Sequence, residues 1–139
     1  MHKHILIATD GSKLADKAVV AGLELAKQFG AKVTAVTVSE PQTHLAPDTG
    51  FYDLPDDESD ALDILEGVDK KASGLDVHCE TVHIKNQYPA DAILKEAKAR
   101  DCDLIVMSSH GRRALGRALL GGEAVRVVTH SDVPVLVCK

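Results

Sequence analysis

Short apolar runs alternate along the chain with longer segments whose apolar residues recur at helical spacing. The short runs are rich in Val, Ile or Thr and are bounded by turn residues, which predicts buried strands over residues 5–9, 33–38, 77–84, 104–107 and 133–137. The segments between them carry apolar residues three or four positions apart, which predicts helices over residues 14–29, 62–72, 89–97 and 124–128.

Capping residues support the helix boundaries. Ser12 precedes the first helix, and its hydroxyl can accept a hydrogen bond from a backbone N–H of the first turn. Gly30 follows the same helix where a left-handed residue is favoured, and Pro89 suits the first turn of the third helix. Residues 39–57 differ, because prolines, Gly50 and acidic residues predict a long loop, of the kind that serves as a functional flap or stays disordered.

The alternation of strands and helices predicts the fold class. Strands that are apolar on both faces indicate a parallel sheet with helices on each side, so we expect one α/β domain over residues 1–139. If the first strand is central and the fourth lies beside it, the strand order is 3-2-1-4-5. The loop after residue 8 and the stretch 108–125 would then face each other at the carboxyl edge of the sheet, where such folds bind ligands.

Composition and charge exclude several classes of protein. The chain of 139 residues has a formal net charge of −5, no Trp, and no sustained run of Lys or Arg, so we expect no nucleic-acid partner. No apolar run approaches the roughly 20 residues that span a bilayer, and the run after His4 is too short for a signal peptide. The three cysteines form no recognisable disulfide framework, so we expect reduced thiols and a cytoplasmic location.

Glycines mark the stretch 108–125 as the candidate ligand loop. Gly111 follows the fourth strand, and Gly121 and Gly122 precede the last helix, whose N-terminal N–H groups can bind phosphate. Judged from spacing alone, the interpretation that these glycines only shape turns is as good as the interpretation that they bind phosphate. The stretch has neither the Lys-Ser/Thr of a Walker A loop nor a G-x-G-x-x-G fingerprint after the first strand.

Three segments, HILIATDGS near the start, DLIVMSSHGR at the fourth strand and LLGGEAVRVVTHSDVPVLV near the end, resemble the universal stress protein family. The resemblance covers essentially the whole chain. It implies a Rossmann-like fold with a doubly wound five-stranded parallel sheet of order 3-2-1-4-5, four helices, and a homodimer formed through the last strand. The nucleotide-binding branch of the family carries G-x2-G-x9-G-[ST] after the fourth strand.

That motif maps onto Ser108, Gly111, Gly121 and Gly122, with nine residues between Gly111 and Gly121. Two positions depart from it. Gly122 keeps its backbone N–H but lacks the hydroxyl, which costs one side-chain hydrogen bond worth about 0.5–1.5 kcal/mol. Ser108 adds a Cβ where the family has glycine, which can weaken or exclude a phosphate contact.

The resemblance also implies further nucleotide contacts. Asp10 can accept from a ribose hydroxyl or, with nucleotide bound, hold a divalent cation; its alternative role is to cap the first helix. The other implied contacts are Ala8, Thr9, Val38 and Glu123, with Ser109, His110, Arg112 and Arg113 as weaker candidates.

The histidines and cysteines do not predict a metal site. Cys79 and His83 share a strand face, but a spacing of four residues places their Cβ atoms roughly 13 Å apart, too far for one zinc ion. His2 and His4 share a face near the N-terminus, and we expect both to be exposed to solvent.

The function predicted from these residues is a cytoplasmic stress-response regulatory protein that binds ATP or AMP with Mg²⁺ or Mn²⁺ and acts on an unknown protein partner. The alternative is a dimeric interaction protein of the same fold that binds no nucleotide. An enzyme such as a nucleotidyl transferase or hydrolase lacks its signatures, and without an evident general base we expect no catalysis beyond, at most, a slow ATPase activity. The strand between Val133 and Val137 would form an apolar edge, which also favours a homodimer.

Overall fold

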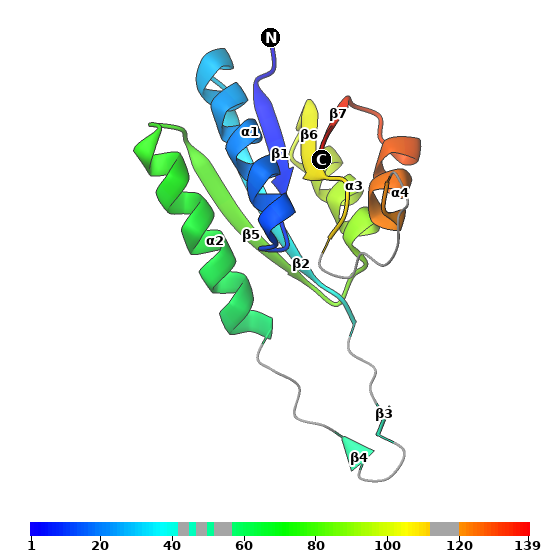
Figure 1. Cartoon of the computed structure of the whole chain (residues 1–139). Helices are drawn as coiled ribbons and strands as arrows, with labels where there is room; N and C mark the ends of the chain where they lie inside the picture. Colours follow the sequence, from blue (N-terminus) through cyan, green and yellow to red (C-terminus); the bar gives the residue numbers. More distant parts are fainter. Residues whose placement is uncertain (42–44, 47–49, 52–56, 112–119) are drawn as a thin grey trace.

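The computed structural model describes residues 1–41, 45–46, 50–51, 57–111 and 120–139. Figure 1 shows its strands, which are β1 (His4–Ala8), β2 (Lys32–Ser39), β3 (Leu45–Ala46), β4 (Gly50–Phe51), β5 (Cys79–Lys85), β6 (Leu104–Ser108) and β7 (Val135–Cys138). Its helices are α1 (Lys13–Phe29), α2 (Asp57–Gly74), α3 (Pro89–Ala99) and α4 (Gly122–His130). Within these described segments, no helix is both long enough and apolar enough to cross a membrane.

Five parallel strands form the main sheet in the order β5-β2-β1-β6-β7. This order confirms the predicted 3-2-1-4-5 arrangement, because β5, β6 and β7 are the third, fourth and fifth of the predicted strands. The central strand β1 pairs with β2 on one side and β6 on the other, so that Ile5 lies opposite both Val33 and Leu104.

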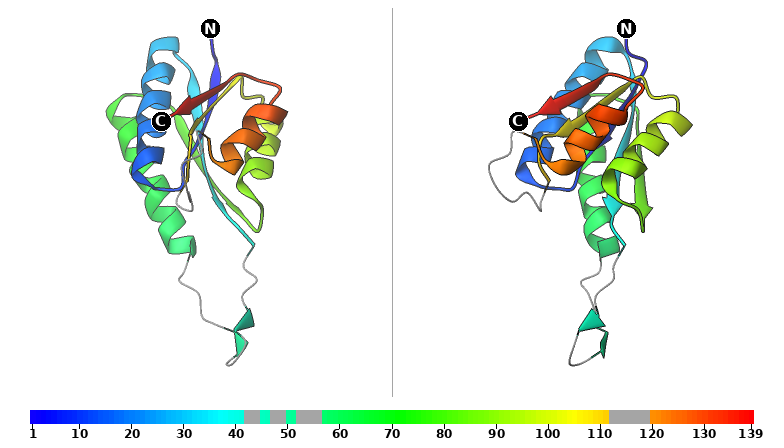
Figure 2. Two further views of the ribbon diagram at one scale, coloured as in Figure 1. Left: turned by 45° about the vertical axis from the view of Figure 1, so that its right-hand side comes forward. Right: turned by 90° about the vertical axis from the view of Figure 1, so that its right-hand side faces the viewer.

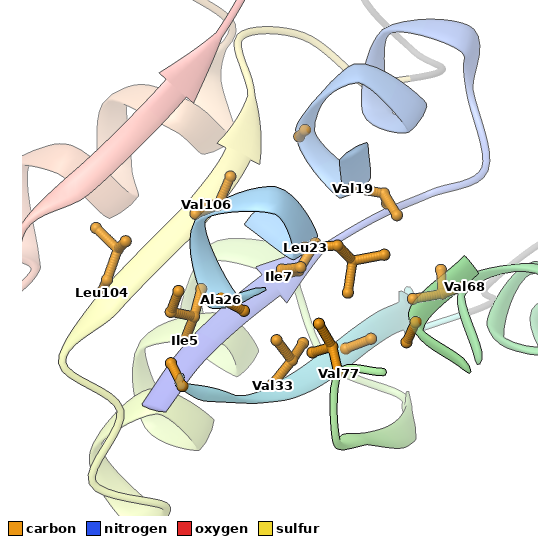
Figure 3. Packing of buried hydrophobic residues seen from close by; sticks show 14 of the residues in the cluster. Ile5, Ile7, Val19, Leu23, Ala26, Val33, Val68, Val77, Leu104 and Val106 are labelled. Atoms are coloured by element: carbon orange, nitrogen blue, oxygen red, sulfur yellow. The ribbon is translucent and has the colours of Figure 1, made fainter. Parts of the chain in front are cut away.

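Helices cover both faces of this sheet, with α1 and α2 on one side and α3 and α4 on the other (Figure 2). Successive side chains of a strand point to opposite faces. Ile5 and Ile7 of β1 therefore pack beneath α1 and α2, as Figure 3 shows, whereas Leu6 packs toward α3 and α4. All three are fully buried, which explains why the strand reads as a continuous apolar run.

The predicted caps of α1 are confirmed. Ser12 Oγ accepts a hydrogen bond from the backbone N–H of Ala15 at 3.2 Å. Gly30 adopts the left-handed conformation with φ 65°. Its N–H donates to the carbonyls of both Ala26 and Lys27 at the end of the helix.

Two strands begin two residues later than the apolar pattern predicts. The N–H of Val77 donates to the carbonyl of Ala72, in the last turn of α2, and so is not available to the sheet. The strand β5 begins at Cys79. The Ser131 hydroxyl bonds both the N–H and the carbonyl of Val133, which keeps that residue out of the ladder, and β7 begins at Val135.

The predicted long loop over residues 39–57 is partly regular. It contains the short antiparallel pair β3–β4, in which Leu45 lies opposite Phe51. The second helix begins earlier than its apolar stripe suggested, at Asp57.

The expectation that His4 is exposed is wrong. His4 opens the central strand β1 and is 8% exposed. Its Nε2 lies 2.7 Å from Thr34 Oγ1 and its Nδ1 lies 3.0 Å from the carbonyl oxygen of Arg100. His2 is also half-buried, with its ring 5.6 Å from that of Phe29. A polar residue at the start of a buried strand was mistaken for part of a free terminus.

Candidate functional site

The candidate site lies at the carboxyl ends of the neighbouring strands β1 and β6. The chain leaves β1 toward α1, on one face of the sheet, and after β6 it reaches α4 on the opposite face. Connections that part in this way leave a crevice outside the strand ends, the usual ligand position in doubly wound sheets. The predicted pairing of the loop after Ala8 with the loop after Ser108 follows from this topology.

The loop after β1 is held by its own side chains. Thr9 Oγ1 accepts from the N–H of Gly11 at 3.1 Å, and Asp10 Oδ1 accepts from the N–H of Ser12 at 2.9 Å. Gly11 has φ 79°, a conformation that favours glycine. Asp10 is thereby fixed at the end of the strand, one residue beyond the buried Thr9.

Asp10 also reaches the loop after β6. A Cβ built on Gly111 would lie 2.7 Å from Asp10 Oδ2, closer than real atoms pack. Glycine at this position therefore allows the two loops to meet. The structure brings together two predicted site residues that are 101 positions apart in the chain.

Hydrogen bonds within the turn after β6 use the side chains of three predicted residues. Ser108 Oγ donates to the carbonyl of His110 at 2.9 Å, and Ser109 Oγ lies 3.1 Å from His110 Nδ1. The other ring nitrogen of His110, Nε2, is buried and has no hydrogen-bond partner among the described residues. Ser108 lies two positions after Val106 and therefore on the same face of β6, the face that packs against α1. Its side chain projects away from the face that carries α4.

The N-terminus of α4 lies beside the turn after β6. The N–H of Gly121 donates to the carbonyl of Ser109 at 2.7 Å, and a Cβ at Gly121 would lie 3.1 Å from that oxygen. Gly121 is the N-cap and has no side chain, so it makes no capping bond to the first-turn N–H groups, which begin with Gly122. A Cβ at Gly122 would meet nothing within 4 Å.

The side chain of Glu123 bonds a neighbouring helix. Its Oε2 accepts a hydrogen bond from the backbone N–H of Ala90, at the start of α3, at 2.6 Å. This contact was missed from the sequence. The available signal was the pair Tyr88-Pro89, which opens a helix without a capping side chain.

Other predicted contacts lie in different surroundings. Val38, near the end of β2, is half-buried and packs in the same apolar cluster as Ala8. Arg112 and Arg113 lie outside the described residues. The part of the chain that the structure describes contains no group of three metal-ligating side chains, and His83 Nε2 bonds Ser39 Oγ at 2.7 Å.

A pocket of about 370 Å³ lies at the opposite edge of the sheet, where α1 and α2 end. Its lining includes Lys27, Lys32, Asp76 and His78, none of which belongs to the candidate site. The carboxyl ends of the strands and this pocket are therefore separate places on the molecule.

The whole chain, residues 1–139, matches the model of the universal stress protein family. A universal stress protein of Methanocaldococcus jannaschii is 33% identical over 144 residues, which cover 100% of this chain and 83% of that one. One from Bacillus subtilis is 32% identical over 149 residues, covering 100% of both chains.

Solved structures of the family share this fold. A universal stress protein from Lactobacillus plantarum superposes with a TM-score of 0.80 at 21% identity, over 99% of this chain and 98% of the other. A universal stress protein in complex with cAMP gives 0.76 at 24%, over 98% and 96%. One from Archaeoglobus fulgidus in complex with dAMP gives 0.74 at 18%, over 100% and 98%. This chain therefore belongs to the universal stress protein family.

Proposed function

We propose that this chain is a stress-response regulatory protein that binds an adenine nucleotide, ATP or AMP, in the crevice between the ends of β1 and β6. The observation that carries the proposal is the meeting of Asp10 with Gly111 beside the N-terminus of α4. A carboxylate that can bond a ribose hydroxyl thus lies beside a loop that leads to a helix N-terminus able to bind phosphate. This pairing is what a nucleoside phosphate requires.

Local geometry supports phosphate binding at α4. A Cβ at Gly121 would crowd Ser109, whereas the space beside Gly122 is open. The first-turn N–H groups of α4 receive no capping bond from the N-cap residue Gly121, and a phosphate oxygen can accept from such groups. His110 Nε2 is a buried ring nitrogen that lacks a partner within the described residues, as expected where a ligand completes the hydrogen bonding.

Relatives of the same fold support the chemical class of the ligand. Two of the solved universal stress proteins contain cAMP and dAMP, both of which join an adenine base to a phosphate. Mg²⁺ or Mn²⁺ would accompany a triphosphate and neutralise part of its charge. Asp10 is the carboxylate that would hold such a cation, because its Oδ2 lies on the Gly111 side of the crevice.

The described residues of the crevice do not form an evident catalytic arrangement. We therefore propose that the output of binding is a change in shape or assembly read by another protein in the cytoplasm, not turnover. A second function has one observation in its favour: Gly121 already donates its N–H to Ser109, which removes one phosphate donor. A nucleotide-free interaction protein is thus the alternative.

Thermal unfolding with and without ligand tests the proposal. A ligand that binds only the folded state stabilises it by about 2.7 kcal/mol at 100 times its Kd. We expect millimolar AMP, or ATP with Mg²⁺, to raise the Tm of the parent. The increase should be lost in Asp10→Ala and kept in Asp63→Ala, a control that removes an exposed carboxylate from α2. No increase in the parent would favour the interaction protein.

A further inference from the structure

The N-termini of α3 and α4 differ in how they are capped. At α3, the residue before the helix is Tyr88, which makes no capping bond, and Pro89 occupies the first turn. A carboxylate from α4, that of Glu123, supplies the missing acceptor to Ala90. At α4 the N-cap residue is Gly121, which has no side chain to make a capping bond. One helix end is thus satisfied by an internal anion, and the other is left for a ligand.

The direction of the Glu123 side chain is unexpected for its position. A glutamate in the first turn ordinarily stabilises the positive end of its own helix and would compete there with a phosphate. Glu123 instead directs its carboxylate to the neighbouring helix, 2.6 Å from the Ala90 nitrogen. The short distance between an ionised acceptor and a backbone donor is typical of a charge-assisted hydrogen bond.

This bond joins two helices that also share a core. Ala90 and Ala124 are 0% and 2% exposed and belong to the same apolar cluster. A second link, between Arg126 and Asp91, is exposed, with 2.8 Å between its nitrogen and oxygen. Exposed ion pairs contribute little, so the bond to Ala90 is the stronger polar restraint on the first turn of α4.

We propose that Glu123 is a positioning residue for the anion site at the N-terminus of α4. By holding the first turn of α4 against α3, it fixes the direction of the Gly122 and Glu123 N–H groups. Its Oε2 meanwhile accepts from the N–H of Ala90. This inference deepens the proposed nucleotide function and rests on it.

Two substitutions separate positioning from charge. Glu123→Gln removes the charge but keeps an oxygen that can accept from Ala90, whereas Glu123→Ala removes both. If Glu123 acted only by repelling phosphate, both variants would bind AMP more tightly. Positioning predicts that Glu123→Ala binds AMP roughly fivefold more weakly in a calorimetric titration, with Glu123→Gln at least as tight as the parent. Equal tightening in both variants would overturn the inference.

A rescue experiment separates positioning from general stability. In the Glu123→Ala background, Tyr88→Asp gives α3 a cap of its own, and Tyr88 is 55% exposed and can be replaced without repacking the core. We expect this double variant to regain Tm but not affinity for AMP, because the first turn of α4 still lacks its bond to Ala90. If affinity returned together with Tm, Glu123 would be merely structural. Arg126→Gln, which removes only the exposed link, should leave affinity unchanged.

Amide hydrogen exchange gives a readout that needs no nucleotide. The Gly121 N–H donates to Ser109 at the start of α4, so its exchange reports whether this turn is held. Exchange should accelerate in Glu123→Ala, and in its Tyr88→Asp derivative, but not in Glu123→Gln. A parent that bound no AMP would refute the proposed function alone, whereas identical exchange in all variants would refute the role of Glu123.

Discussion

Asp10 and Gly111 approach so closely that a Cβ on Gly111 would lie 2.7 Å from Asp10 Oδ2. The other oxygen of the same carboxylate accepts from the Ser12 N–H at 2.9 Å. The carboxylate therefore spans the two loops at the ends of β1 and β6. It cannot turn away from Gly111 without disturbing the turn that begins α1.

We predict that Gly111→Ala weakens nucleotide binding and lowers the free energy of unfolding by about 1 kcal/mol, the value of the Ser12 hydrogen bond that Asp10 must give up. Urea unfolding and an AMP titration measure the two effects. Gly67→Ala in α2 is the control, since a Cβ there meets nothing within 4 Å, and it should leave the affinity for AMP unchanged. Unchanged affinity in Gly111→Ala would show that the close approach to Asp10 is not needed for binding.

We predict that Gly122→Ser tightens nucleotide binding. A Cβ fits at Gly122 without contact, and the added hydroxyl restores the side-chain donor that the family motif carries there. One hydrogen bond is worth about 0.5–1.5 kcal/mol, so the Kd should fall by roughly twofold to tenfold in calorimetry. Gly122→Ala is the control without the hydroxyl. Equal affinities for the Ser and Ala variants would contradict phosphate binding at this position.

We predict that Gly22→Ala destabilises the fold although alanine is the better helix former. A Cβ at Gly22 of α1 would lie 2.6 Å from Ile7 Cδ1, and Ile7 is fully buried in β1. Overpacking costs about 1–3 kcal/mol, which exceeds the gain of roughly 0.8–1 kcal/mol in helix propensity. Gly67→Ala should be stabilised by that gain alone. Urea midpoints compare the two, and a stabilised Gly22→Ala would refute the tight packing of α1 on β1.

We predict that His4 makes stability fall on mild acidification. Burial lowers the pKa of His4 below its ordinary 6.5, assisted by the charges of Lys32 and Arg100 and opposed by a hydrogen bond to the Arg100 carbonyl and by Glu80. The folded state therefore favours the neutral ring. This contribution is complete above pH 6.5 and is lost as the pH falls toward the lowered pKa.

The comparison of the parent with His4→Gln isolates this effect. The difference in their free energies of unfolding should be larger at about pH 7.5 than at about pH 5.5, because only the parent loses stability between them. His130→Gln, at the exposed end of α4, is the control. Hydrogen bonds from Lys3 and His4 lower the pKa of Asp103, against the effect of burial. Its contribution to the free energy of unfolding therefore changes only below its ordinary pKa of 3.8, outside the pH range of the comparison with His4→Gln. A difference that does not change with pH would contradict the assignment.

We predict that the chain forms a homodimer through β7. Among the described strands, β7 is at the edge of the sheet and pairs with β6, and its Leu136 is 38% exposed. A lysine on an edge strand opposes pairing between chains, so Leu136→Lys should sediment as a monomer where the parent is a dimer. Leu62→Lys, which replaces a leucine of α2 that is 57% exposed, should leave assembly unchanged. A monomeric parent would refute the prediction.

The sheet could be predicted from the sequence because its strands are buried on both faces. Ile5, Leu6 and Ile7 are consecutive and all fully buried, so apolar content alone marks the strand. Its boundaries were less predictable, because they depend on local polar contacts. Val133 has an apolar side chain, yet both its N–H and its carbonyl are hydrogen-bonded to the Ser131 hydroxyl, and it lies outside β7.

The candidate site could be predicted in its two loops but not in its long-range side-chain hydrogen bonds. Glycine spacing and the end of β1 indicated Gly111 and Asp10, and the strand order places them together. The bonds of His4 to Thr34 and Arg100 and the bond from Glu123 to Ala90 were not predicted. The apolar pattern indicates which face of a strand or helix is buried, but not which polar side chain reaches a neighbouring element.

The measurement that tests nucleotide binding most directly is an amide NMR titration of the parent with AMP. The proposal predicts that chemical shift changes concentrate at residues 8–11, 108–111 and 120–124, and saturate with one equivalent of AMP per chain. Changes centred on Lys27, Lys32 and His78 would place the ligand in the pocket at the opposite edge of the sheet. Either that result or an unchanged spectrum at millimolar AMP would contradict nucleotide binding between β1 and β6.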